Sequence, residues 1–198
     1  MNGAQALRIE PLQAAPLPSQ RRANRMWLAR IIQAQRSGQS CLPFHLGLAE
    51  DEYAQLIGEH FPEQAGATSK GLGLLAHECA ELREELLMMR NDEWQDLRGL
   101  LLAGRRGRGV DEVWMASIVA AGCMGGSHLW RDLGLASRLD LRELLVHNFP
   151  LLAMRNVLDM RWKKFFYKQL CEQEGGYVCR SPSCNICPTF QDCFGEEL

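Results

Sequence analysis

A run of fifteen residues near the end of the chain holds four of the eight cysteines in this sequence of 198 residues. Their spacing is C-x4-C-x2-C-x5-C, and Pro182 and Pro188 prevent a continuous helix through the run. Such a short polar segment buries too little apolar area to be well ordered by itself, but a bent chain can bring four sulfur atoms around one centre. We therefore predict a metal centre here. Its predicted ligands are Cys179, Cys184, Cys187 and Cys193.

Two kinds of metal centre suit thiolate ligands, which are soft and select zinc or iron–sulfur clusters over hard cations. Zinc fingers typically join two close ligand pairs, whereas here only Cys184 and Cys187 form such a pair. The first three cysteines match the opening of plant-type ferredoxin motifs, but the fourth follows after five residues instead of a long interval. The pattern favours an iron–sulfur-type cluster and leaves two alternatives, a zinc site and a surface loop with incidental thiols.

Charge and hydropathy limit the other classes of function. With 22 basic and 24 acidic residues, the net charge is −2, so no overall basic field attracts nucleic acid. The stretch "RRGRG" at 105–109 is too short for an arginine–glycine tract and is typical of a loop. The first 22 residues lack the apolar run of a signal peptide, and the longest mostly apolar segment is shorter than the roughly 20 residues of a membrane span. We expect a cytoplasmic protein without membrane contact, in which thiols stay reduced.

Apolar residues recur at helical spacing along most of the chain, and no convincing alternating strand pattern occurs. The first two predicted helical faces are Ala23, Trp27, Ile31 and Ala34, ending at Gly38, and Tyr53, Leu56, Ile57 and His60. Asn91 or Asp92 predicts a break between two further helices. Asp140 with Glu143 predicts a capping box. Pro150 predicts the start of a last helix that continues to the glycines at 175 and 176.

These patterns predict an all-α fold in three parts. A flexible tail rich in Pro, Ala and Gln covers residues 1–20. A helical, bundle-like domain covers residues 21–176. An irregular, cysteine-rich metal-binding segment covers residues 177–198.

Basic and aromatic residues alternate in "MRWKKFFYK", just before the cysteine motif. The cations are Arg161, Lys163, Lys164 and Lys168. Fixed cations stabilise thiolates and oxyanions, so these residues are candidates for assisting metal handling. The alternative is an amphipathic helix whose aromatic residues pack in the core and whose lysines face solvent. Contact with single-stranded nucleic acid is a third interpretation, but no nucleic-acid module surrounds the stretch.

Other cysteines and histidines give weaker signals. Cys171 is either close to the cluster or a buried structural thiol. Cys123 and His128 flank "MGGS", where they would meet an incoming metal or simply be packed. No spacing joins the rest to a site: Cys41, Cys79, His45, His60, His77 and His147. The sequence contains no paired catalytic carboxylates, nucleophile elbow or phosphate-binding glycine loop, so we expect no enzyme.

The cysteine motif, preceded by "MRWKKFFYKQLCEQEG" and followed by "FGEE", resembles the NifQ family of nitrogen-fixation proteins. The resemblance extends upstream to "GCMGGSHLWRDLGL" and "NFPLLAMRN", and so covers about residues 110–198. It implies a molybdenum–iron–sulfur (Mo–Fe–S) cluster bound by the four motif cysteines.

The resemblance also implies a function and partners. The function is a metallocluster carrier that processes and donates molybdenum for biosynthesis of the nitrogenase iron–molybdenum cofactor (FeMo-cofactor). The implied partners are the cofactor-assembly scaffold, the nitrogenase iron protein, and molybdate or another molybdenum source. Two alternatives stay open: an electron-transfer iron–sulfur protein on a helical scaffold, and a zinc-stabilised interaction module.

Overall fold

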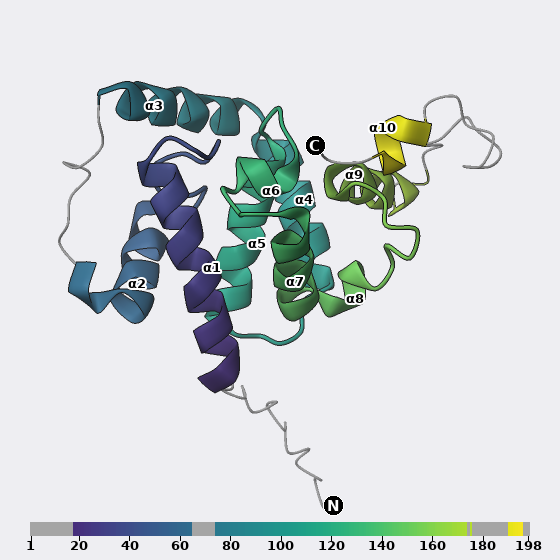
Figure 1. Ribbon diagram of the computed structural model, residues 1–198, viewed down its shortest axis with the longest axis horizontal. Helices are drawn as coiled ribbons and strands as arrows, with labels where there is room; N and C mark the ends of the chain where they lie inside the picture. The colour runs from purple at the N-terminus through teal and green to yellow at the C-terminus, as the bar shows by residue number, and fades with distance from the viewer. Residues whose placement is uncertain (1–17, 65–73, 174, 176–189, 196–198) are drawn as a thin grey trace, which may run out of the picture.

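The computed structural model describes residues 18–64, 74–173, 175 and 190–195, and these residues form helices and connecting loops without a strand (Figure 1). The helices are α1 (Pro18–Arg36), α2 (Glu50–His60), α3 (Leu74–Met89), α4 (Asn91–Ala103), α5 (Val110–Cys123), α6 (Leu129–Asp132), α7 (Arg138–Asn148), α8 (Pro150–Ala153), α9 (Trp162–Gln173) and α10 (Phe190–Phe194), with a short 3-10 helix at Pro62–Gln64. The all-α prediction is confirmed for this part of the chain. The metal-binding character of the C-terminal segment and the three-part division stay predictions.

Helix α5 occupies the middle of the molecule, with α1 on one side and α4 and α7 on the other (Figure 1). Every residue from Trp114 to Cys123 is buried, which explains why this helix has no polar stripe. Ser117 is the polar residue within that run. The Trp94 indole N–H of α4 donates to the Ser117 carbonyl at 3.1 Å, and the Arg98 Nε donates to its hydroxyl at 2.8 Å. These bonds fix α4 along α5 while leaving no polar group of Ser117 unsatisfied.

The predicted faces of α1 and α2 are confirmed, because the apolar side chains at helical spacing pack into the core. Ile31 and Leu56 are fully buried, and α1 ends just before Gly38, whose φ is 73°. His60 is also buried, where its Nε2 lies 3.1 Å from Oδ1 of Asp111. The predicted break in the third helical stretch is confirmed between α3 and α4; Arg90 occupies the cap position of α4, and Asn91 is its first residue.

Two details of the helix prediction are wrong. The cap of α7 is Ser137, whose hydroxyl accepts the Asp140 N–H at 3.1 Å, so Asp140 lies inside the helix and is not its cap. The last helix is also not continuous, since α8 ends at Ala153 and α9 begins at Trp162. Pro150 does begin α8, as predicted.

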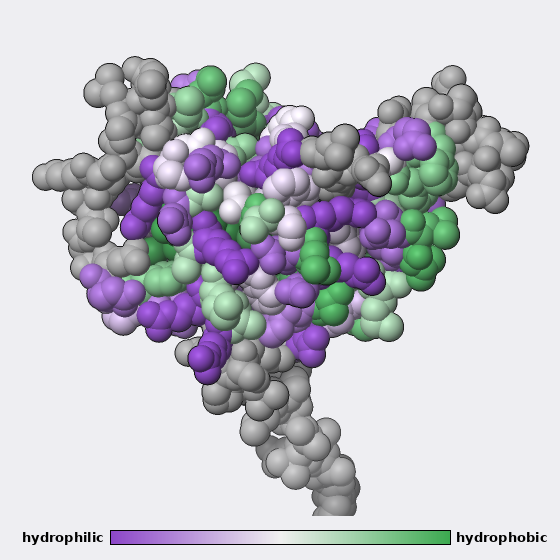
Figure 2. Space-filling model, in the orientation of Figure 1, coloured by the Kyte–Doolittle hydropathy of each residue, from purple (hydrophilic) through white to green (hydrophobic). Residues whose placement is uncertain are grey.

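The loop between α8 and α9 is held by side chains that compete with helical hydrogen bonds. Asn156 accepts the Met160 N–H at 2.9 Å and donates to the Met160 carbonyl at 2.8 Å. Arg138 donates to the side chain and the carbonyl of Asp159, which has a φ of 52°. Around this fixed loop, hydrophobic surface gathers on the side of the molecule where α8 and α9 lie (Figure 2). Its exposed side chains are Leu151, Met154, Val157 and Leu158.

A close approach of two backbones brings the α1–α2 loop to α6. Gly134 has a φ of 74°, and a Cβ there would lie 2.0 Å from the Cβ of Ala34. Only glycine fits both the left-handed conformation and this contact. As a result, the Cys41 N–H donates to the Asp132 carbonyl at 2.9 Å.

Candidate functional site

Cys193 is the motif cysteine that the structure describes, and Cys179, Cys184 and Cys187 lie outside the described residues. Cys193 is half-buried on α10, which lies beside α9 at the edge of the molecule (Figure 1). Within the described ranges, no three His, Cys, Asp or Glu side chains converge as metal ligands would. The assignment of the four motif cysteines therefore stays a prediction.

Helix α10 is attached to the residue that precedes α9. The Arg161 N–H donates to the Cys193 carbonyl at 2.7 Å, and the Arg161 Nε donates to the Gly195 carbonyl at 3.2 Å. Phe190 and Phe194 stack on each other with their ring centroids 4.6 Å apart, one turn from each other on α10. The backbone of the fourth motif cysteine is thus tied to one of the predicted basic residues.

Helix α9 has the amphipathic character that its sequence predicts, because its aromatic residues turn into the core. Trp162, Phe165 and Phe166 are buried, and their ring centroids lie 5.9 Å from one another. Lys164 is exposed, and Lys168 lies 3.6 Å from Glu172 at the helix surface.

Lys163 differs from its neighbour Lys164, and the alternative interpretation, in which the lysines of this helix face solvent, is wrong for Lys163. Its side chain is only 18% exposed and forms an ion pair with Asp132 of α6, whose side chain is 7% exposed. The Lys163 Nζ also donates to the Gly125 carbonyl at 2.7 Å. The Asp132 carboxylate accepts the Ser127 N–H at 3.0 Å as well. Because both charges are paired and hydrogen-bonded, their burial is tolerated.

Two thiols lie against this ion pair. A Cβ on Gly125 would lie 2.5 Å from both Cys41 Sγ and the Asp132 carboxyl carbon, so Cys41 and Asp132 meet over this glycine. Burial, followed by the nearby Asp132 carboxylate, raises the pKa of Cys41 to about 12. Burial likewise raises the pKa of Cys123 to about 12, and the Lys163 charge opposes this shift. Both thiols are therefore protonated at neutral pH, unlike metal-bound or nucleophilic cysteines.

A second polar contact, made by Tyr167, holds the next turn of α9. The Tyr167 hydroxyl donates to the Glu93 carboxylate, which also forms two hydrogen bonds with Arg90 at 2.6 and 2.7 Å. Arg90 in turn donates to the Met124 carbonyl at 3.0 Å. The hydrogen bonds from Arg90 lower the pKa of Glu93, while burial and then Glu93 raise the pKa of Tyr167.

The structure thus brings together Cys123 and Lys163, which the sequence suggested, with Cys41 and Asp132, which it did not. Cys41 lies 82 residues before Cys123, so spacing contained no signal for their proximity. His128 is half-buried just before α6, where its carbonyl accepts the Asp132 N–H at 2.9 Å.

The other cysteines and histidines are dispersed over the described fold. Cys171 is half-buried near the end of α9, and Cys79 is exposed on α3. His45 packs beside Tyr53, and His147 packs beside Trp27. The side chain of His77 lies outside the described residues.

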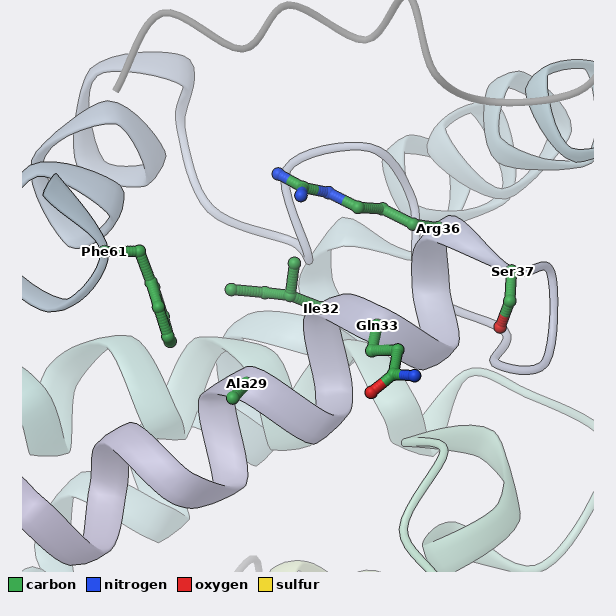
Figure 3. Close-up of a pocket in the computed structure, with 6 residues that line it drawn as sticks. All are labelled: Ala29, Ile32, Gln33, Arg36, Ser37 and Phe61. Atoms are coloured by element: carbon green, nitrogen blue, oxygen red, sulfur yellow. The ribbon is translucent and has the colours of Figure 1, made fainter. Parts of the chain in front are cut away.

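A pocket of about 520 Å³ lies between α1 and the residue that follows α2 (Figure 3). It is lined by Ala29, Ile32, Gln33, Arg36, Ser37 and Phe61. No cysteine lines it, so this pocket is separate from the thiols described above. In the same described part of the chain, no helix is long and apolar enough to cross a membrane.

The fold and these residues define an all-helical protein with a terminal cysteine motif and an internal cluster of thiols and paired charges. A model of the NifQ family matches residues 27–195, and the chain belongs to this family of nitrogen-fixation proteins. The resemblance seen in the sequence is confirmed.

Known relatives agree over most of the chain. It is similar to Protein NifQ of Azotobacter vinelandii, with 71% identity over 177 residues, covering 89% of this chain and 91% of the relative. Protein NifQ of Klebsiella pneumoniae is 39% identical over 172 residues, covering 85% and 96%. A Protein NifQ homolog of Sinorhizobium fredii is 35% identical over 169 residues, covering 85% and 69%. No solved structure gives a significant match.

Proposed function

We propose that the protein is a metallocluster carrier that processes molybdenum and donates it for biosynthesis of the nitrogenase FeMo-cofactor. The observation that carries the proposal is the extent of the family match, which ends at residue 195 and so includes the whole cysteine motif. Four thiols in fifteen residues are a donor set suited to an Mo–Fe–S cluster, because molybdenum and iron in sulfide clusters both take soft sulfur ligands. The cluster is the cargo, and the motif cysteines are its predicted ligands.

The position of Cys193 supports a transfer role. It lies on α10 at the edge of the molecule and is half-buried, so a ligand there is approachable by another protein (Figure 1). A ligand set inside the helical core would have to open the core before release. A carrier needs firm binding together with access, and a peripheral segment tied to α9 through Arg161 offers both.

The internal thiols Cys41 and Cys123 are unsuited to act as nucleophiles. A nucleophilic cysteine needs a lowered pKa, usually from a nearby cation. Here the pKa values of Cys41 and Cys123 are raised to about 12 by burial, despite the Lys163 ammonium. Neither thiol is activated for covalent chemistry at neutral pH.

The proposed partners follow from the cargo. The molybdenum source is molybdate or a species derived from it, and the proposed recipients are the cofactor-assembly scaffold and the nitrogenase iron protein. Direct transfer would be tested by mixing metal-loaded protein with the scaffold and the iron protein under anaerobic conditions, and then measuring molybdenum on the re-isolated scaffold. Retention of all molybdenum on the carrier would contradict the proposal.

Metal analysis of anaerobically purified protein is the decisive experiment. Molybdenum together with iron and sulfide is the expected result. Iron and sulfide alone would favour the electron-transfer protein, and zinc alone would favour the interaction module. A matched preparation in which all four motif cysteines are replaced by alanine should contain none of these metals.

A further inference from the structure

The ion pair between Lys163 and Asp132 joins α9 to α6. Lys163 reaches 31 residues back along the sequence to Asp132 and also bonds the Gly125 carbonyl at 2.7 Å. Asp132 is held in turn by the Ser127 N–H at 3.0 Å, and its carbonyl by the Cys41 N–H at 2.9 Å. Lys163 therefore contacts Gly125 and Asp132 directly, and Asp132 extends this connection to the backbone N–H groups of Ser127 and Cys41.

The same end of α9 holds α10. Arg161 binds the Cys193 carbonyl through its N–H and the Gly195 carbonyl through its side chain. The Arg161 carbonyl accepts the Phe165 N–H at 2.9 Å, which makes Arg161 continuous with the first turn of the helix. Because Arg161 and Lys163 are two residues apart on one rigid turn, any shift of α9 moves both.

We propose that Lys163 is a positioning residue for Cys193 on α10: by pairing with Asp132, it sets the rotation and axial position of α9, and α9 thereby places Cys193. Lys164, which is exposed on the same turn, has no such role. The inference rests on the proposed function for the role of Cys193 as a metal ligand, but its test requires no metal.

The test is the rate at which Cys193 reacts with iodoacetamide in reduced, metal-free, full-length protein. Peptide mass spectrometry measures Cys193 labelling, and exposed Cys79 on α3 serves as the internal reference. In Lys163→Met and in Asp132→Asn, we expect the Cys193:Cys79 rate ratio to rise at least about tenfold, because local release of α10 exposes the thiol without global unfolding. Lys164→Met should keep the wild-type ratio.

Three results would overturn the inference. One is an unchanged ratio in Lys163→Met. Another is an equal rise in Lys164→Met. The third is a rise that occurs only together with loss of helical circular dichroism at the assay temperature, which would make Lys163 a general stability residue.

A spectroscopic measurement on metal-loaded protein is a second readout. If the cluster is present, its electron paramagnetic resonance line shape should change in Lys163→Met and stay unchanged in Lys164→Met. Absence of any cluster in wild-type protein would contradict the proposed function while leaving the labelling result valid. The two proposals therefore fail in distinguishable ways.

Discussion

The Lys163 ammonium on α9 forms an ion pair with the Asp132 carboxylate on α6, and both side chains are largely withdrawn from solvent. This ion pair joins the helix that precedes the cysteine motif to α6, and Lys163 also bonds the Gly125 carbonyl in the loop that contains "MGGS". The position of Asp132 also explains why residue 125 is a glycine, since a side chain there would collide with Asp132 and Cys41. The pair is a structural connection between the helical core and the candidate metal-binding segment.

Loss of one member of this pair should destabilise the fold. Removing one partner of a buried ion pair leaves an uncompensated charge and typically costs about 3–5 kcal/mol. We expect Asp132→Asn and Lys163→Met each to lower the free energy of unfolding by an amount near the lower end of that range. The double variant should lose less than the sum of the two, because the second change removes the charge left by the first. Urea unfolding followed by circular dichroism measures all three.

The exposed ion pair between Arg25 and Glu63 is the control for the stability measurements on the Asp132 and Lys163 variants. Its atoms are 3.6 Å apart, and more than half of each side chain is exposed. Because solvent screens such pairs, Arg25→Met should change stability by no more than about 1 kcal/mol. An equal loss of stability at the two ion pairs would contradict the larger contribution expected from the buried pair of Asp132 and Lys163.

The raised pKa of Cys123 predicts a pH-dependent stability. Its pKa in the folded protein is about 12, against an ordinary value of 9.0, so folding favours the protonated thiol. The stability from this preference is complete below pH 9 and declines between pH 9 and about 12, by up to about 1.4 kcal/mol per pH unit. Cys123→Ala should therefore lose less stability than wild type between pH 8 and pH 10. Urea midpoints at both values measure the difference, and parallel losses in the two proteins would contradict the assignment.

Replacement of a motif cysteine should remove metal without removing the fold. We expect Cys179→Ala, Cys184→Ala, Cys187→Ala and Cys193→Ala each to lower iron and molybdenum content sharply. Helical circular dichroism should be nearly unchanged, since the buried core is formed by other residues and Cys193 is only partly buried against it. Elemental analysis after anaerobic purification measures this, with Cys79→Ala as the control that keeps full metal content. Full loading of the four motif variants would exclude these cysteines as ligands.

Cells without the protein should fix nitrogen poorly only when molybdate is scarce. An excess of molybdate can supply a slower, unspecific route, because raising the concentration of a free ligand bypasses a step that a carrier assists. Growth without fixed nitrogen, measured across a series of molybdate concentrations, tests this expectation. A defect of constant size across the series would favour the electron-transfer alternative.

Local sequence patterns predicted most of the helices because their signals lie within a few residues. Helical periodicity located α1 and α2, and Pro150 located the start of α8. The break after α8 was missed because it depends on Arg138 and Asn156, whose bonds to the loop compete with a continuous helix. The residues around that loop do not indicate that Arg138, 21 residues earlier, bonds to Asp159.

The sequence by itself determined the helical class, the family and the four thiols of the motif, since each depends on residue type and short spacing. Tertiary structure alone decided that Cys41 meets Asp132 and that Lys163 is buried while adjacent Lys164 is exposed. The physical reason is that a lysine side chain can be buried only where a residue from another part of the fold pairs with its charge. Desolvation and pairing depend on packing between distant segments, which no local pattern encodes.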